Sequence, residues 1–353
     1  MIPKRRSSRH SNHHLHGRKR KWIILAAVAY AVLLVAILVL PKVLSKDDRT
    51  HTDVPGNGAE LFDTAIRYSS NGADYVYRQS DLTTLLLIGV DREGLNKGES
   101  LTARSNTQAD FLLLLVLDRE NKALTPIQID RDAIVPVDVY GVLGNLTGTR
   151  EMQVCLAQGF GKTLDANCRN TSAAVSGMLL GIPIDHYMVY DLSAINVLND
   201  LLGGVTVTVE DDLTELDSAL SVGSTVTLHG EQAEIFVRSR MGIGDGTNVS
   251  RLRRQRAYME SALSIVTEKS SIDSSFIQGL IGGMEGYYAS DMNRGYVVNL
   301  FNRAIGYDMR PIRVTDGEHG VGKDGFMECY LNEELLHCQD QRMLRKLHKI
   351  YLR

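Results

Sequence analysis

Apolar residues fall into short continuous runs through the first half of the chain. Runs of strand length cover residues 83–90, 111–118 and 123–130. The first two are apolar almost throughout, which is typical of strands buried on both faces of a sheet. Only the four residues 119–122 separate the second run from the third, so we expect a hairpin and an antiparallel pair there.

Helical patterns then alternate with further strands. We expect helices from about Thr171 to Leu180, over 192–204, from near Gly230 and from about Arg251, with strands at 185–191 and 205–210, and more helical signals at 276–288, 296–305 and 341–353. Strands interleaved with helices are typical of a sheet covered on both faces. The pattern therefore predicts an α/β fold, a three-layer α-β-α body with a mixed central sheet.

A different pattern begins the chain. Residues 22–40 are a run of nineteen residues without a charge. As a helix this run would be about 28 Å long, close to the hydrocarbon thickness of a bilayer. We expect an uncleaved transmembrane helix, because the run exceeds the apolar core of a signal peptide and no small-residue cleavage site follows; a cleaved signal peptide is the alternative. Basic residues 18–21 precede the span and Asp47 and Asp48 follow it, which predicts a cytoplasmic N-terminus.

These patterns divide the chain into five expected parts. They are a basic cytoplasmic tail (1–21), a transmembrane helix (22–40), an extracytoplasmic stalk with a lead-in helix (41–80), a catalytic domain (81–270) and a C-terminal helical extension (271–353). Residues 1–50 hold eleven of the 39 Lys and Arg residues but two of the 42 Asp and Glu residues, so the rest of the chain is net acidic. An exported acidic body argues against nucleic acid as a partner.

Charged residues gather where the three apolar runs of the first half end. If the first two runs also pair antiparallel, one edge of the sheet carries the end of the first, the start of the second and the end of the third. That edge would hold Asp91-Arg92, Asp110 and Asp130-Arg131-Asp132. Mg²⁺ binds carboxylates together with phosphate oxygens and water, so Asp91 and Asp110 are the best ligand candidates. Buried, ion-paired carboxylates are the alternative.

Six arginines and no lysine occupy residues 236–256. Arg251, Arg253 and Arg254 would lie in the first turn of a helix, where the helix dipole disfavours cations. Their repetition indicates a bound anion, because helix N-termini and guanidinium groups both bind phosphate. Arg251 and Arg254 share one flank of the helix, so we expect these two to contact the anion. A solvated helix face with ion pairs to Asp and Glu is the alternative.

The four cysteines form two short-range pairs after the apolar span. In an exported protein this spacing favours two local disulfides, Cys155–Cys168 and Cys329–Cys338, although the sequence permits three pairings. Reduced and buried thiols are the alternative.

Several blocks resemble the LytR-CpsA-Psr (LCP) family, in the same order and spacing, over roughly residues 81–268. They are TLLLIGVDRE, QADFLLLLVLD, IQIDRDAIV, GIPIDHYMVYDL, LNDLLGGVTVTVEDDL, LHGEQAEIFVRSR and SRLRRQR. The resemblance implies an LCP-like fold, a membrane anchor, and a phosphotransferase that moves a glycopolymer from a polyprenyl-pyrophosphate carrier onto peptidoglycan. The alternatives are a non-enzymatic envelope protein that holds polyprenyl-pyrophosphate lipids, or a polyprenyl-pyrophosphate phosphatase.

The resemblance also implies roles for individual residues. Asp91 and Asp110 look like ligands of Mg²⁺, with Mn²⁺ as the alternative ion. Asp132 would orient a neighbouring arginine or assist proton transfer. The arginines that would bind pyrophosphate are Arg131, Arg238, Arg240, Arg251 and Arg254, joined by Arg92 beside Asp91.

Three positions depart from the family pattern. Gln108 stands where the family commonly has arginine, and Arg104 upstream is a candidate substitute for it. Asn248 stands where a carboxylate is frequent, and Asp130 replaces a common proline. An insert at residues 142–170 carries the first cysteine pair, and we expect it to border the lipid or sugar site.

Overall fold

The computed structural model describes part of the chain: residues 67–70, 73–76, 82–91, 107–141, 143–179, 181, 183–192, 194–240, 242–244, 248–315 and 317–331. The expected membrane span at 22–40 lies outside these residues. Within them, no helix combines the length and the apolar character needed to cross a bilayer.

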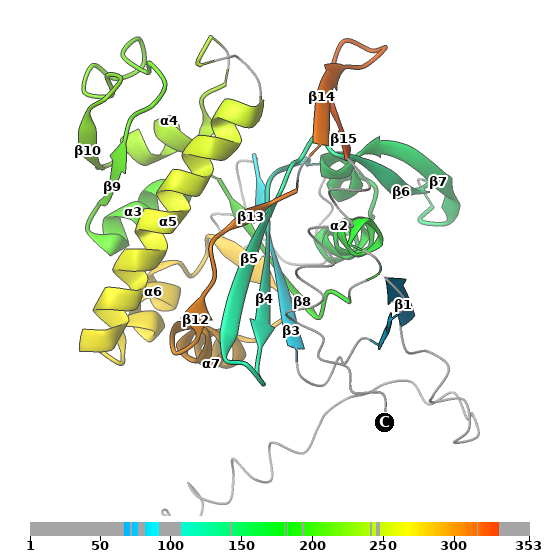
Figure 1. Ribbon diagram of the computed structural model, residues 1–353, viewed down its shortest axis with the longest axis horizontal. Helices are drawn as coiled ribbons and strands as arrows, with labels where there is room; N and C mark the ends of the chain where they lie inside the picture. The colour runs from blue at the N-terminus through cyan, green and yellow to red at the C-terminus, as the bar shows by residue number, and fades with distance from the viewer. Residues whose placement is uncertain are drawn as a thin grey trace, which may run out of the picture. The chain divides into compact units, whose positions relative to one another are not determined.

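A mixed sheet forms the centre of the described fold (Figure 1). Its strands run in the order β11 (Tyr288–Ser290), β8 (His186–Asp191), β3 (Leu82–Val90), β4 (Ala109–Asp118), β5 (Ala123–Ile129) and β12 (Asp308–Met309), and β13 (Arg313–Val314) also pairs with β5. β3 and β5 are both antiparallel to β4, as the sequence predicts, and β8 is parallel to β3. The predicted mixed α/β sheet fold is therefore confirmed.

Alternate residues of β3 face opposite layers of the core. Leu86 and Ile88 pack into a cluster with side chains of α2 (Leu164–Met178), whereas Leu85 packs into a second cluster with α6 (Phe276–Gly283) and α7 (Arg294–Ile305). This period of two is what a strand buried on both faces requires. A third cluster joins α3 (Ala194–Leu202), α4 (Gln232–Arg238) and α5 (Asn248–Ile272) to the hairpin β9–β10 (Val205–Thr208, Thr225–Leu228).

The C-terminal part differs from the expected helical extension. Residues after 270 do form α6 and α7, but they also contribute β11, β12 and β13 to the central sheet. The boundary drawn at residue 270 therefore lies inside a unit that shares one sheet. The sequence does not reveal this, because strands of two or three residues carry too little pattern to be recognised. The described end of the lead-in also differs, since it forms the hairpin β1–β2 (Arg67–Ser70, Ala73–Val76).

Two further hairpins stand near one end of the sheet (Figure 1). The first is β6–β7 (Ile134–Tyr140, Leu146–Gln153), which leads into the short helix η4 (Val154–Gly159). β7 and η4 lie within the expected insert at 142–170. The second is β14–β15 (Gly317–Val321, Met327–Leu331). It is attached to the segment after β5 by two backbone contacts. Cys329 forms an isolated parallel β-bridge with Ala133, and the Cys329 amide donates to the carbonyl oxygen of Asp132 at 2.8 Å.

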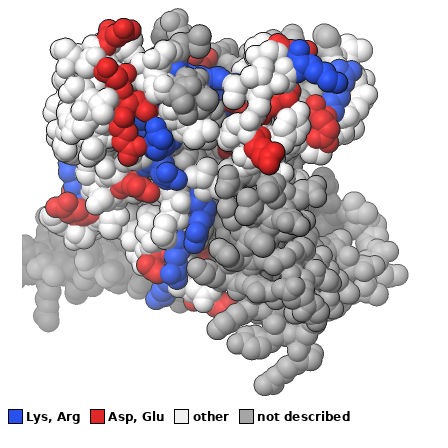
Figure 2. All heavy atoms as spheres, turned by 45° about the horizontal axis from the view of Figure 1, so that its top comes forward, with Lys and Arg blue, Asp and Glu red and all other residues white. Residues whose placement is uncertain are grey.

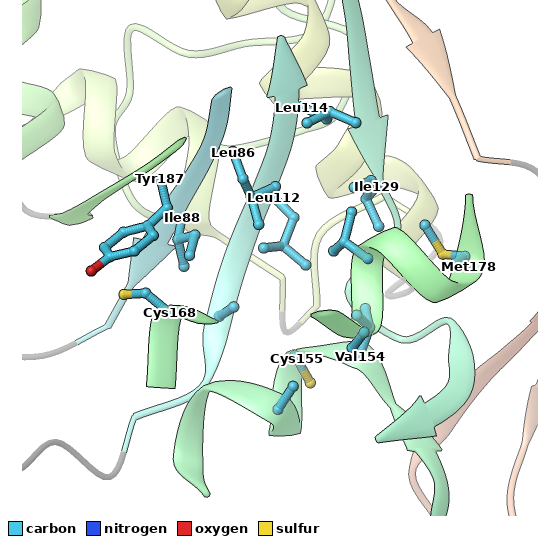
Figure 3. Packing of buried hydrophobic residues seen from close by; sticks show 14 of the residues in the cluster. Leu86, Ile88, Leu112, Leu114, Ile129, Val154, Cys155, Cys168, Met178 and Tyr187 are labelled. Carbon is cyan, nitrogen blue, oxygen red and sulfur yellow. The ribbon is translucent and has the colours of Figure 1, made fainter. Parts of the chain in front are cut away.

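The predicted Cys155–Cys168 disulfide is wrong, because both residues are separate buried thiols. Figure 3 shows them among the apolar side chains of the α2 cluster. Each sulfur has its own neighbour: Arg131 lies 3.1 Å from Cys155 Sγ, and the Gln158 amide lies 3.5 Å from Cys168 Sγ. Burial raises the pKa of Cys168 to about 12, so the thiol is neutral. Cys338 lies outside the described residues, and its pairing with Cys329 stays a prediction.

Candidate functional site

The site lies where β3 ends, β4 begins and β5 ends, as the order of the apolar runs predicts. The register between β3 and β4 shifts between Gly89 and Val90, just before Asp91. Gly89 is required by close packing, since a Cβ there would lie 2.5 Å from a methyl carbon of Leu192. The side chain of Asp91 remains 56% exposed at this edge.

Asp110 and Arg131 form the ion pair at the centre of this edge. Their side chains are 17% and 12% exposed, so solvent reaches the pair only in part. The Arg131 guanidinium also donates to Gln108 Oε1 at 2.7 Å and to Cys155 Sγ at 3.1 Å. Burial alone would lower the pKa of Arg131, but Cys155 and Asp110 outweigh it, and the net pKa is raised. Gln108 thus supplies an acceptor for Arg131 where an arginine would repel it.

Asp132 is a buried carboxylate with an unused oxygen. Its side chain is 2% exposed, and Oδ1 lies 3.5 Å from Arg131 Nε and accepts from Gln153 at 3.2 Å. Oδ2 has no hydrogen-bond partner among the described residues. Burial raises the pKa of Asp132, and this outweighs the lowering by Arg131. Such a carboxylate accepts a proton more readily than an exposed one.

Arg251 brings a second guanidinium to Asp110 from the first turn of α5. Its Nη1 lies 4.0 Å from Asp110 Oδ1, while Nε and Nη2 donate to Asn248 Oδ1 at 3.0 and 2.5 Å. Burial, followed by repulsion from Arg131 and Arg240, lowers the pKa of Arg251 to about 10. Arg240 has no ion-pair partner among the described residues. These three guanidinium groups therefore form a positive cluster that an added anion would stabilise.

Arg238 meets Asp91 at the open side of the site. Its Nη2 lies 2.6 Å from Asp91 Oδ2, and its Nη1 pairs with Glu234 one turn earlier in α4. Burial lowers the pKa of Arg238, but Asp91 and Glu234 raise it by more, so the net pKa is raised. Residues 91 and 238, far apart in sequence, are thus direct neighbours.

Arg254 occupies a different place from the one expected. Its side chain is 2% exposed and pairs with Asp211, and it donates to the backbone carbonyls of Phe236 and Ser239. Arg253 also binds Asp211, at 2.9 Å, and Glu210. Both guanidinium groups thus bind other groups of the same protein. Arg254 therefore fixes the segment that carries Arg238 and Arg240, and this geometry does not support it as a direct ligand of an anion.

Other predicted residues have different outcomes. Arg92 and Arg104 lie outside the described residues. Sequence reasoning missed Glu234, whose signal is its spacing of four from Arg238 on one helix. It also missed Asp211, the buried partner of Arg254, and the contact of Asn248 with Arg251. On the face shown in Figure 2, Lys and Arg side chains lie next to Asp and Glu rather than in one broad basic field.

Residues 46–314, more than half of the chain, match the model of the LytR_cpsA_psr family. The chain belongs to this family, as its sequence blocks predict. It is 27% identical over 213 residues to the cell wall biosynthesis protein LcpA of Corynebacterium glutamicum, covering 54% of this chain and 41% of LcpA. It is 26% identical over 206 residues to the polyisoprenyl-teichoic acid–peptidoglycan teichoic acid transferase TagU of Bacillus mycoides, covering 58% of this chain and 60% of TagU. The matches span less than two thirds of either relative.

Solved structures share the fold. The protein gbs0355 from Streptococcus agalactiae superposes with a TM-score of 0.60 at 20% identity, covering 76% of this chain and 89% of that one. TagT bound to LI-WTA superposes with a TM-score of 0.55 at 19% identity, covering 76% and 91%.

Proposed function

We propose that the protein is a phosphotransferase that moves a glycopolymer from a polyprenyl-pyrophosphate carrier onto peptidoglycan. The observation that carries this proposal is the convergence of Arg131, Arg238 and Arg251 on Asp91 and Asp110 at one sheet edge. Membership of the LytR_cpsA_psr family and similarity to a teichoic acid transferase support the same class of substrate.

The arginines would bind the pyrophosphate. Arg131 and Arg240 both repel Arg251 in a partly buried site, and a phosphate group beside Arg251 would offset that repulsion. Arg238, at the more exposed side, would hold the second phosphate. Phosphoryl transfer depends mainly on positioning and on stabilising charge on phosphate oxygens, which guanidinium groups provide.

Asp91 and Asp110 would hold Mg²⁺, or Mn²⁺ in its place. The donor set fits, because hard carboxylate oxygens at one edge suit an ion that takes one or two carboxylates plus phosphate oxygens and water. Bound there, the ion would neutralise charge on the transferred phosphate. Each carboxylate now pairs with an arginine, Asp91 with Arg238 and Asp110 with Arg131. With Asp91 and Asp110 holding the ion, Arg238 and Arg131 would be available to bind the phosphates.

Asp132 would take the proton from the attacking hydroxyl of peptidoglycan. Its free Oδ2 and its raised pKa suit a general base. Its Oδ1 lies near Arg131 Nε, so the same residue also orients Arg131. The predicted transmembrane helix at 22–40 would keep this site outside the cell, close to the membrane lipid that carries the substrate.

The direct experiment uses the full-length protein in detergent with a polyprenyl-pyrophosphate-linked glycopolymer, Mg²⁺ and peptidoglycan fragments. We expect the wild type to form linked polymer and Asp91→Ala or Arg238→Ala to lose at least about a hundredfold of the rate. Arg253→Gln is the matched control, because Arg253 is half exposed and its partners lie outside the site. It should transfer at the wild-type rate.

Other products would point to the other functions. Bound lipid without turnover would make the protein a binding or regulatory protein of the envelope. Released phosphate without linked polymer would make it a phosphatase. Linked polymer at the wild-type rate from both site variants would remove this cluster from the mechanism.

A further inference from the structure

The hairpin β14–β15 reaches the candidate site from beyond the part of the chain that matches the family, which ends at residue 314. His319 and Cys329 are directly opposite each other in its register. The hairpin is attached to the segment 130–132 through the backbone contacts of Cys329 with Asp132 and Ala133. A chain segment outside the family match therefore lies on the loop that carries Arg131.

His319 binds the first residue of that loop. Its Nε2 lies 2.6 Å from Asp130 Oδ2, and the Asp130 side chain is 1% exposed. Cys329 Sγ is within 4.8 Å of both atoms. A separation of 2.6 Å leaves room for one shared proton between the nitrogen and the oxygen, whereas two ligands of one tetrahedral metal ion lie farther apart. The pair is therefore a hydrogen bond.

Asp130 links His319 to Asn248, because each of these residues binds one of its two carboxylate oxygens. Its other oxygen, Oδ1, accepts from the Asn248 side-chain amide at 2.6 Å and from the Asp132 backbone amide at 2.9 Å. The NH₂ group of Asn248 donates to Asp130, so the side-chain oxygen of Asn248 faces the other way. Asn248 is fully buried, and that oxygen accepts two hydrogen bonds from Arg251.

We propose that His319 is a positioning residue for the anion site, acting on Arg251 through Asp130 and Asn248. Without His319, Asp130 Oδ2 would lose its donor, and the carboxyl group would turn toward another one. That change removes the reason for the Asn248 amide to point as it does. The amide could then turn its NH₂ group toward Arg251. A guanidinium group only donates hydrogen bonds, so Arg251 would lose its partner and leave its place beside Asp110.

This inference rests on the proposed function in taking pyrophosphate as the anion. The test measures the affinity of the full-length protein in detergent for inorganic pyrophosphate by calorimetry. His319→Ala should bind about tenfold more weakly, because a hydrogen bond to a buried charge is lost. His319→Gln keeps an N–H donor and should stay within about threefold of wild type. Glu318→Gln, an exposed neighbour on the same strand, should bind like wild type.

A double-mutant cycle separates positioning from a general loss of structure. In an Arg251→Ala background, His319→Ala should cause no further loss of affinity, because the residue it positions is gone. Thermal unfolding of each variant shows whether it folds. If His319→Ala does not fold, His319→Phe carries the test, because it fills the same space without a donor and should show the same tenfold loss.

Three results would overturn the inference. They are wild-type affinity in His319→Ala, an equal loss with and without Arg251, and a wild-type protein that binds no pyrophosphate. Transfer activity is read separately. Intact pyrophosphate binding without transfer would remove the proposed function and leave the role of His319 standing.

Discussion

Two arginines one turn apart on α5 have opposite surroundings. Arg254 is saturated by a buried carboxylate and two backbone carbonyls. Arg251 has one amide oxygen at hydrogen-bond distance, a carboxylate at 4.0 Å, and two other guanidinium groups close enough to lower its pKa. The same residue type on the same helix flank thus serves to hold the fold at one position and to present charge at the other. The partners of a guanidinium group, rather than its place on the helix, decide its role.

Arg254→Met should have the largest effect, and the effect should be on stability. Removing one partner of a buried ion pair leaves Asp211 with the half-exposed Arg253 as its ion-pair partner among the described residues, and it leaves two backbone carbonyls without their donor, which together cost about 3 kcal/mol. The free energy of unfolding, measured with denaturant, should fall by this amount, whereas Arg251→Met should change it much less. Equal losses in the two variants would contradict the comparison.

Arg131→Ala should have the largest effect on transfer. The variant loses a guanidinium group aimed at the phosphates, which costs about 10²–10³-fold in rate. Rates of glycopolymer transfer and melting temperatures should be measured together. Arg294→Ala is the control, because its exposed ion pair is with Glu285 and with no residue of the site. A rate loss that merely follows a lost fold would argue against a direct role.

Asp132→Asn should lower the rate about a hundredfold, as expected for a lost general base. In the wild type, transfer should fall as the pH drops through the raised pKa of Asp132, because the carboxylate becomes protonated. The contribution of Asp132 to the free energy of unfolding has the opposite pH dependence. A raised folded-state pKa gives a contribution that is complete below the unfolded-state pKa and is lost as the pH rises through the folded-state pKa.

The asparagine variant should therefore melt above the wild type at neutral pH, and the difference should close in acid. A lower melting temperature for Asp132→Asn at neutral pH would show that Asp132 is needed mainly as a partner of Arg131.

Cys155→Ala should have the smallest effect. The thiol is a weak acceptor for Arg131, so its loss should weaken pyrophosphate binding by no more than about threefold. Mass spectrometry of the intact protein after alkylation under denaturing conditions should find Cys155 and Cys168 both modified. Protection of this pair until a reductant is added would restore the predicted disulfide.

Local pattern was sufficient to predict β3, β4 and β5, and hence the edge where Asp91, Asp110 and Arg131 meet. It also predicted an arginine-rich start of α5. The buried partners of Arg254 and Asp130 could not be predicted in this way, because Asp211 is 43 residues before Arg254 and His319 is 189 residues after Asp130. The strands after residue 270 were missed for a similar reason, since a two-residue strand such as β12 is defined only by its neighbour β5.

The arginines of the positive cluster come from different elements of the fold: Arg131 lies in the loop after β5, and Arg251 lies in α5. An anion held by both would tie the helical layer to the sheet, so occupancy would add to the free energy of unfolding by mass action. A protein with a bound anion would then resist heat and proteases better than an empty one, so occupancy of the site would regulate how long the folded protein survives.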